Sequence, residues 1–299
     1  MGILKDLTKE YFGEKVRKED EIDIFGLEVE IVSFKDNNGK YHERGYKPND
    51  LDILDELLKR MIEIRGDEGD FNDIDTSDIK NMAFLFEDKT TFNGDISGWD
   101  VSKVKNMEGM FRSATSFNQP IGKWDVSSVE NMKEMFNNAT SFNQPIGKWD
   151  VSSVENMSFM FRKATSFNQK IGNWEFPNVT DMSFMFRSAT SFNQDISDWK
   201  FPKVTNMQCL FKGAKAFNQK IGNWEFPVVK NMYGVFKSAT SFNQPIGDWK
   251  FPNVENMGNM FEDATSFNQD ISKWNIKNVD ASNMFKNCPI KNKHKPKME

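Results

Sequence analysis

The sequence has few of the residues on which most enzyme sites depend. Among its 299 residues there are only two histidines, His42 and His294, and two cysteines, Cys209 and Cys288. Neither histidine has a candidate ligand or nucleophile near it in the sequence, so metal chemistry and histidine-based acid–base catalysis have little to work with. Glycine-rich phosphate loops and nucleophile motifs do not occur either. We therefore expect a protein that is not an enzyme and that uses no cofactor or metal.

Long apolar runs and an excess of basic residues are also missing. No run approaches the roughly 18 apolar residues of a membrane helix, so we expect no membrane insertion. The formal net charge is -5, whereas a nucleic-acid-binding surface normally shows as a basic excess, so we expect no nucleic-acid partner. The first ten residues include acidic residues, Asp6 and Glu10, where a signal peptide would have its apolar core. These features predict a location inside the cell or within a larger particle.

What the sequence does contain is a period of 25 residues. All eight tryptophans follow it, and so does a phenylalanine that is always followed by asparagine. These residues are Trp99, Trp124, Trp149, Trp174, Trp199, Trp224, Trp249 and Trp274, with Phe92, Phe117, Phe142, Phe167, Phe192, Phe217, Phe242 and Phe267. A fixed period of this size indicates a solenoid of stacked copies. We predict a solenoid of about eight repeats over residues 71–290, an N-terminal cap over 1–70 and a basic, disordered tail over 291–299.

The N-terminal 70 residues read as helix, hairpin and helix. Apolar spacing predicts a short helix within residues 1–20, and alternation over 25–43 predicts a β-hairpin that turns at Asn38-Gly39. A second helix is expected to begin at an Asn49 N-cap and to end at Gly66. We favour a cover for the open end of the first repeat over a partner-binding helix. An enzyme site in this region is the least favoured function.

Within a repeat, the spacing predicts a strand and a short helix. Trp124 and Val126 are two residues apart and so share one strand face, with Asp125 on the other. Apolar residues from Val129 to Ala139 follow three- and four-residue steps, which predicts a short helix. The strands of successive coils are expected to form a parallel sheet on one face of the solenoid.

An asparagine and a methionine also recur once per period. The asparagines are expected to form an inward ladder that bonds the backbone of the next coil, although a ligand site repeated eight times is the alternative. They are Asn93, Asn118, Asn143, Asn168, Asn193, Asn218, Asn243 and Asn268. The methionines, from Met82 to Met257, are expected in the core.

Charged residues recur at two outward positions of the predicted strand. Where one position is acidic the other is often lysine, and where the second is Lys200 or Lys250 the first is aspartate. We favour a structural account, in which the exchange limits repulsion between stacked like charges, over cation binding. This variable face is our candidate partner-binding site. Its residues are Lys123, Asp125, Lys148, Asp150, Glu175, Asp198, Lys200, Glu225, Asp248 and Lys250.

The repeat resembles the BspA-type leucine-rich repeat in its 25-residue version, found in bacterial surface lipoproteins and in large DNA viruses. The resemblance rests on Ile121-x-x-Trp124-x-Val126-Ser127-x-Val129-x-x-Met132-x-x-Met135-Phe136-x-x-Ala139-x-x-Phe142. It covers about residues 71–290, where Pro177 and Cys288 match the proline and the final cysteine of the family pattern. The resemblance implies an α/β fold: a right-handed, leucine-rich-repeat-like solenoid with a parallel sheet on one face and short helices or turns on the other. It implies no catalytic residue.

Two functions are compatible with these expectations. The first is a non-enzymatic protein-interaction or adhesion module that uses the outward sheet face, because relatives of the repeat mediate adhesion or protein binding. The second is an architectural component of a larger assembly, such as a large DNA virus particle. The resemblance allows a cell-surface location. The identity of the protein partner and the oligomeric state are left open.

Overall fold

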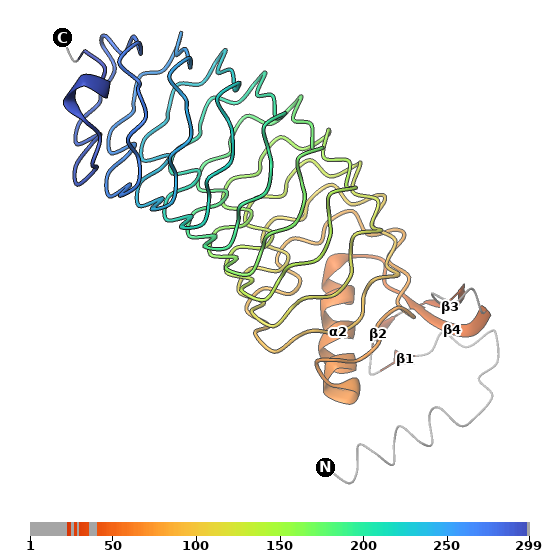
Figure 1. Cartoon of the computed structure of the whole chain (residues 1–299). Coiled ribbons are helices and arrows are strands. Elements are labelled where there is room, and N and C mark those ends of the chain that lie inside the picture. Colours follow the sequence, from red (N-terminus) through yellow and green to blue (C-terminus); the bar gives the residue numbers. More distant parts are fainter. Residues whose placement is uncertain (1–22, 25–26, 29, 36–40, 298–299) are drawn as a thin grey trace.

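The computed structural model describes residues 23–24, 27–28, 30–35 and 41–297. From about residue 70 onward the backbone winds in successive coils stacked along one axis, with the N-terminal elements at one end of the stack (Figure 1). Parallel bridges join residues one period apart, such as Asn106 with Asn131 and Asn131 with Asn156. In the part of the chain that the structure describes, no helix is long and apolar enough to cross a membrane.

The N-terminal elements begin with two short antiparallel pairs of strands. Their bounds are β1 (Asp23–Ile24), β2 (Leu27–Glu28), β3 (Glu30–Lys35) and β4 (Tyr41–Lys47). β1 pairs with β2, and β3 pairs with β4. The predicted hairpin is thus confirmed for its two strands, while its turn at Asn38-Gly39 and the predicted helix within 1–20 lie outside the described residues.

Helix α2 (Leu51–Arg65) follows the hairpin and covers the end of the stack. Its N-cap is Asp50 rather than the predicted Asn49, because the Asp50 carboxylate accepts the N–H of Ile53 at 2.9 Å. The helix ends at Gly66, as predicted, where the backbone turns to a φ of 80°. The buried side chains that α2 adds to the hydrophobic core of the coils are Leu54, Leu57, Leu58 and Met61.

Strand β4 and helix α2 are also tied to the first coil through polar contacts. Tyr46 of β4 bridges Ile74 in parallel, and its N–H donates to the carbonyl of Asp73 at 2.8 Å. The guanidinium of Arg65, at the end of α2, donates to both carboxylate oxygens of Asp73 at 2.7 Å. Two-pronged pairs of this kind hold a fixed geometry as well as a charge, so the cap has a defined orientation on the stack.

The core of the coils consists of columns of identical side chains, which we name after their members in residues 117–141. Rings of the Phe136 column stack on the next coil with centroids 5.3–5.9 Å apart. In the Trp124 column all eight indoles are buried, with exposed fractions of 1–4%. Each indole N–H donates to a backbone carbonyl 28 residues earlier, at 2.9–3.3 Å. Burial therefore costs the indoles no hydrogen bond, and their predicted interior position is confirmed.

The segment predicted as a short helix, which ends at Ala139, is a series of turns instead. Its N–H groups alternate between acceptors in the same coil and acceptors in the next coil. Those of Met135, Asn137 and Ala139 donate to the carbonyls three residues earlier, whereas those of Met132, Glu134, Phe136 and Asn138 donate to Asn156, Ser158, Met160 and Arg162 of the next coil. The N–H of Lys133 donates to the Asn131 side chain at 3.0 Å. Every N–H from 132 to 139 is therefore satisfied without a helix. We call residues 131–138, and their equivalents one period apart, the ladder segment.

Two residues of the ladder segment have left-handed backbone, which an α-helix excludes. Glu134 has a φ of 58° and Asn138 a φ of 61°, whereas helical residues need a φ near −63°. The turns bring Met132, Phe136 and Ala139 inward at the three- and four-residue steps that the sequence shows. The ladder segment also carries the pairing between coils that the sequence predicts for the strand around Trp124. In the described residues, no parallel bridge between two coils falls on that predicted strand.

The predicted asparagine ladder is confirmed on another side of the coil. The side-chain carbonyl of each asparagine accepts the backbone N–H of the asparagine one coil later, at 2.9–3.0 Å from Asn93 to Asn268. The neighbouring glutamines, such as Gln119 and Gln144, donate to the backbone carbonyl of the preceding asparagine at 2.7 Å. The asparagine thus satisfies the turn N–H, and the glutamine satisfies the turn carbonyl.

The C-terminal tail covers part of the last coil, so the prediction of disorder is wrong for residues 291–297. The 3₁₀ helix η1 (Asn292–His294) lies at the end of the stack. The Lys291 N–H donates to the side chain of Asn268 at 3.0 Å and thereby continues the asparagine ladder. The Ile271 N–H donates to the carbonyl of His294 at 3.0 Å. The tail satisfies backbone groups that a further coil would otherwise have bonded.

Candidate partner-binding surface

The ten charged residues chosen from the sequence are all exposed, but they do not lie on a sheet. They belong to the Lys123 and Asp125 columns, beside the turn that precedes the ladder segment. Asp125 accepts from the N–H and the hydroxyl of Ser127, at 3.1 and 2.6 Å. Asp150 accepts from the N–H of Ser152 at 3.0 Å, and hydrogen bonding from Ser152 lowers the pKa of this carboxyl. These carboxylates therefore already hold their own turns.

Among the described residues, these ten charged residues take part in no ion pair and in no cluster of metal ligands. No ion pair within 4 Å involves any of the ten residues. Across residues 41–297 and the described strands before them, no three His, Cys, Asp or Glu side chains gather as metal ligands. The exchange of acid and lysine between coils therefore creates no close pair.

The outer side of the ladder segment shows stronger variation. We define the ladder face as the outward side chains of the Lys133, Glu134, Asn137 and Asn138 columns. The Glu134 column reads Phe84, Gly109, Glu134, Phe159, Phe184, Cys209, Gly234 and Asn259, and the Asn137 column reads Glu87, Arg112, Asn137, Arg162, Arg187, Lys212, Lys237 and Glu262. The inward Phe136 column between them is phenylalanine in every coil. The coil thus keeps its interior constant and changes this outer face.

Toward both ends of the ladder face, the basic residues are paired with acids of adjacent coils. Arg112 pairs with Glu87 and, at 3.2 Å, with Glu134. Lys237 pairs with Glu262, and this hydrogen bond lowers the pKa of the Glu262 carboxyl. Lys133 likewise pairs with Glu108 at 2.8 Å. Charge on these parts of the face is largely neutralised.

The middle of the ladder face has an aromatic pair flanked by arginines. The rings of Phe159 and Phe184 stack with centroids 4.5 Å apart and planes 9° apart. The guanidinium groups of Arg162 and Arg187 each lie 5.7 Å from the centroid of the ring in their own coil. We call these four half-buried residues the ridge. Sequence reasoning missed it, although the change of residue type in these two columns was a visible signal.

The ridge arginines differ from their neighbours in having no acidic partner. Among the described residues, Arg162 and Arg187 belong to no ion pair, and the same is true of Lys212 in the next coil. The Nε of Arg162 is the one buried side-chain nitrogen or oxygen in the described chain without a hydrogen-bond partner. Buried polar groups normally have hydrogen-bond partners, so the Arg162 Nε is a donor whose acceptor is not supplied by the described chain.

The ridge phenylalanines also have unfavourable backbone geometry. Phe159 has a φ of 61° and Phe184 a φ of 59°. A left-handed conformation costs a residue with a Cβ about 1–2 kcal/mol. Two other coils have glycine in this column, Gly109 and Gly234. The remaining coils have Phe84, Glu134, Cys209 and Asn259 there, so the strain is shared and the ridge differs in stacking two rings.

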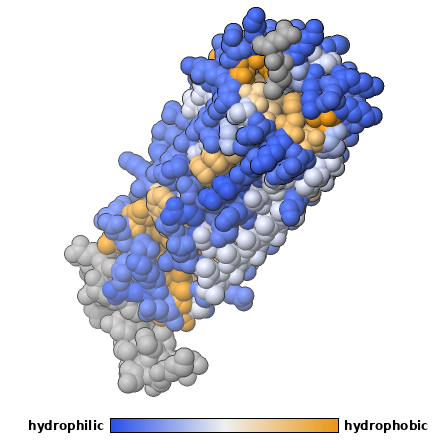
Figure 2. Space-filling model, turned by 90° about the vertical axis from the view of Figure 1, so that its left-hand side faces the viewer, coloured by the Kyte–Doolittle hydropathy of each residue, from blue (hydrophilic) through white to orange (hydrophobic). Residues whose placement is uncertain are grey.

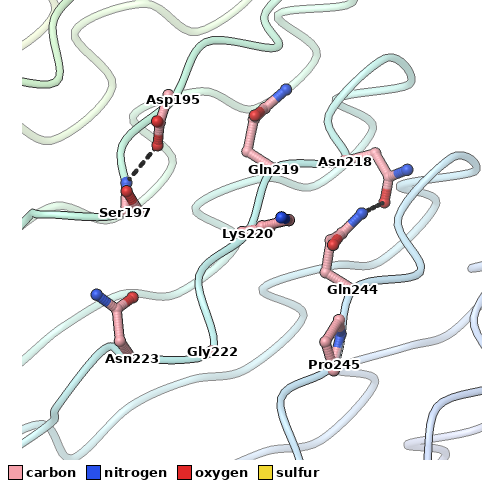
Figure 3. A pocket seen from close by; sticks show the side chains of 9 residues that line it. All are labelled: Asp195, Ser197, Asn218, Gln219, Lys220, Gly222, Asn223, Gln244 and Pro245. Carbon is pink, nitrogen blue, oxygen red and sulfur yellow. Dashed lines mark hydrogen bonds between the residues drawn. The ribbon is translucent and has the colours of Figure 1, made fainter.

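A separate hollow of about 650 Å³ lies between coils near the asparagine ladder (Figure 3). Its polar groups are largely bonded to one another. The Ser197 N–H donates to Asp195 at 2.9 Å, and the Gln244 side chain donates to Asn218 at 3.0 Å. Lys220 lies between these two pairs in the view. Asn218, Gln219 and Gln244 of its lining already serve the stacking of the coils through the asparagine ladder.

The molecular surface is mixed rather than uniformly apolar. Figure 2 shows separate hydrophobic patches set in a largely hydrophilic face along the stacked coils. Among the described large hydrophobic side chains, Phe84 and Val228 are the exposed ones, at 39% and 36%. Large obligate interfaces are more hydrophobic than this, so the surface suits a polar, directional contact.

The stacked coils define a repeat protein, and the comparison with known families agrees. Four overlapping stretches match one family: residues 56–158, 120–212, 145–232 and 199–297. Two of these begin one period apart, at 120 and 145. The chain belongs to this family, which is described as "Mycoplasma protein of unknown function, DUF285". No curated protein and no solved structure matches the chain.

Proposed function

We propose that the chain is a non-enzymatic protein-interaction module that binds its partner on the ladder face. One observation carries this proposal: the stacked rings of Phe159 and Phe184 lie beside Arg162 and Arg187, which belong to no ion pair among the described residues. Left-handed backbone occurs at this position in every coil, and two of the other coils have glycine there. Two stacked rings at such a position cost stability that glycine would avoid, so the rings support a role in binding.

The ladder face supports binding better than the charged columns do. Asp125 and Asp150 are occupied by their own turns, whereas the ridge arginines have no acidic partner. The charged columns remain a second candidate surface. The resemblance to BspA-type repeats also favours a right-handed, leucine-rich-repeat-like solenoid, and with it adhesion or protein binding.

Site-specific photo-crosslinking tests which surface binds. A benzoylphenylalanine is placed at Gln208 on the ladder face, at Asp125 in the charged columns, or at Pro145 on the asparagine side. Each variant is exposed to proteins of the native source and irradiated. We expect adducts at Gln208 that excess unlabelled chain competes away, and none at Pro145. Saturable adducts at Asp125 alone would move the site to the charged columns, and none at any position would contradict the proposal.

The second candidate, an architectural component of a larger assembly, is supported by the two ends of the ladder. In the described chain, four ladder N–H groups at the C-terminal end have no acceptor, and four ladder carbonyls at the N-terminal end have no donor. The N–H groups are those of Ala281, Asn283, Phe285 and Asn287. The carbonyls are those of Asn81, Ala83, Leu85 and Glu87. Such complementary edges favour end-to-end contact. Sedimentation velocity at rising concentration tests this, and a monomer at every concentration would count against it.

A further inference from the structure

We propose that the ridge binds an acidic peptide segment that carries an aromatic or large aliphatic side chain. This inference rests on the proposed function, since it assigns a partner chemistry to the same face. The four residues of the ridge come from two adjacent coils and combine an apolar stack with two guanidinium groups. A ligand for this arrangement needs both carboxylates and an apolar group.

Charge is the first argument. Arg162, Arg187 and Lys212 follow one another in the Asn137 column, on coils joined by a ladder whose steps are about 4.8 Å. Like charges in adjacent coils repel, and none of these three belongs to an ion pair in the described chain. In an extended peptide, side chains two residues apart lie on one side and are separated by about 6.8 Å. Two carboxylates with that spacing can bridge these three cations and relieve their repulsion.

Shape is the second argument. After Phe184, the same column continues with Cys209, which is 2% exposed, and then with Gly234, which has no side chain. Gly213 likewise removes a side chain beside Lys212. Burial raises the pKa of the Cys209 thiol, so this residue stays neutral. Phe184 is thus the last ring of the stack, and the next two residues of its column are small and carry no charge, so an apolar side chain of the partner would meet the free edge of the stack.

A protein segment fits this site better than a nucleic acid. Glu134 precedes the ridge, and Glu262 and Asp263 follow it in the same columns. Glu134 and Glu262 neutralise basic residues of adjacent coils, so the unpaired positive surface is confined to about three coils and is too short for a longer run of phosphates. The net charge of -5 works in the same direction. A short acidic segment avoids the flanking acids.

Fluorescence anisotropy with the full chain tests this inference. The probe is a labelled peptide, Gly-Asp-Ser-Glu-Ser-Phe-Gly, whose two acids and phenylalanine lie on one side when it is extended. Its controls replace the acids by amides or the phenylalanine by alanine, and an oligothymidine serves as the nucleic-acid competitor. We expect R162Q/R187Q to weaken peptide binding about tenfold or more, because charge-assisted hydrogen bonds are lost. F159G/F184G is expected to abolish the preference for the phenylalanine peptide over the alanine peptide.

K105Q/K230Q is the matched control, since it also removes two positive charges, but from lysines outside the ladder face that are paired with Glu130 and Glu255. Binding by K105Q/K230Q should equal that of the wild type. The inference is overturned if R162Q/R187Q binds the acidic peptide as the wild type does, or if oligothymidine binds more tightly than the peptide. If saturable crosslinks at Gln208 accompany either result, the ladder face still binds a protein, and only the proposal that its ligand is an acidic peptide is rejected.

Discussion

The strain at Phe184 predicts an inverted order of two truncations. Phe184→Ala and Phe184→Gly both remove the ring, its stacking on Phe159 at 4.5 Å and its contact with Arg187. The two variants differ only in the Cβ atom. On ordinary backbone, glycine is less stable than alanine by about 0.5–1 kcal/mol. At the φ of 59° of Phe184, alanine retains the strain that glycine avoids.

The size of the inversion follows from these two terms. Left-handed backbone costs a residue with a Cβ about 1–2 kcal/mol, which exceeds the entropic cost of glycine. We therefore expect Phe184→Gly to be more stable than Phe184→Ala by about 1 kcal/mol. In a protein of this size that difference raises the melting temperature by about 1–2 °C.

Urea unfolding followed by tryptophan fluorescence measures this difference, because all eight indoles are buried. Glu155 serves as the control, since it is exposed and does not have positive φ. There Glu155→Gly should be less stable than Glu155→Ala by about 0.5–1 kcal/mol. If Phe184→Ala proves as stable as Phe184→Gly or more so, the argument that left-handed backbone strains Phe184 is refuted.

Two further predictions concern the asparagine ladder and the cap. Asn168→Ala removes the acceptor of the Asn193 N–H at 2.9 Å and of the Gln194 side chain at 3.0 Å, so the free energy of unfolding should fall by about 1–3 kcal/mol. Asn168→Asp keeps an acceptor, so its free energy of unfolding should fall by less. Equal urea midpoints for Asn168→Ala and the wild type would contradict this. Hydrogen bonds from Lys103 and Lys47 lower the pKa of Asp78 from 3.8 to about 2. A carboxyl whose pKa is lowered by folding stabilises the folded state at every pH above the pKa that it has in the unfolded chain. The wild type should therefore have a higher melting temperature than Asp78→Asn near neutral pH, and this difference should disappear as the pH falls from 3.8 toward 2. A constant difference in melting temperature across that range would show that Asp78 does not act through its charge.

The repeated core could be predicted from the sequence because each column is one residue type that recurs every 25 residues. The interior tryptophans, the asparagine ladder and helix α2 follow from recurring residue types and from capping signals. The conformation of the ladder segment could not be predicted in this way. Inward residues of successive turns, from Met132 to Ala139, recur at the same three- and four-residue steps as those of a helix. The sign of φ separates the two, and it is only hinted at by glycines such as Gly109 and Gly234 in the left-handed columns.

The candidate surface was only partly accessible to sequence reasoning. The exposure of the charged columns follows from alternation, and the structure agrees. The ridge depends on which acids reach which bases across 22 to 25 residues, as Arg112 does with Glu134 and Glu87. That pairing depends on the stacking of the coils, so a count of charges does not show that Arg162 and Arg187 lack such partners.

The direction of the hydrogen bonds between coils has one more consequence. Ladder N–H groups such as that of Phe136 donate forward to the next coil, while the indole of Trp124 and the N–H of Asn143 donate back to the preceding one. Each coil therefore offers its two neighbours the same set of donors and acceptors, whatever its number in the series. Duplication or loss of one whole 25-residue unit would leave every remaining unit with equivalent neighbours. The stack can therefore lengthen or shorten during evolution in steps of about 4.8 Å without any change to the ridge.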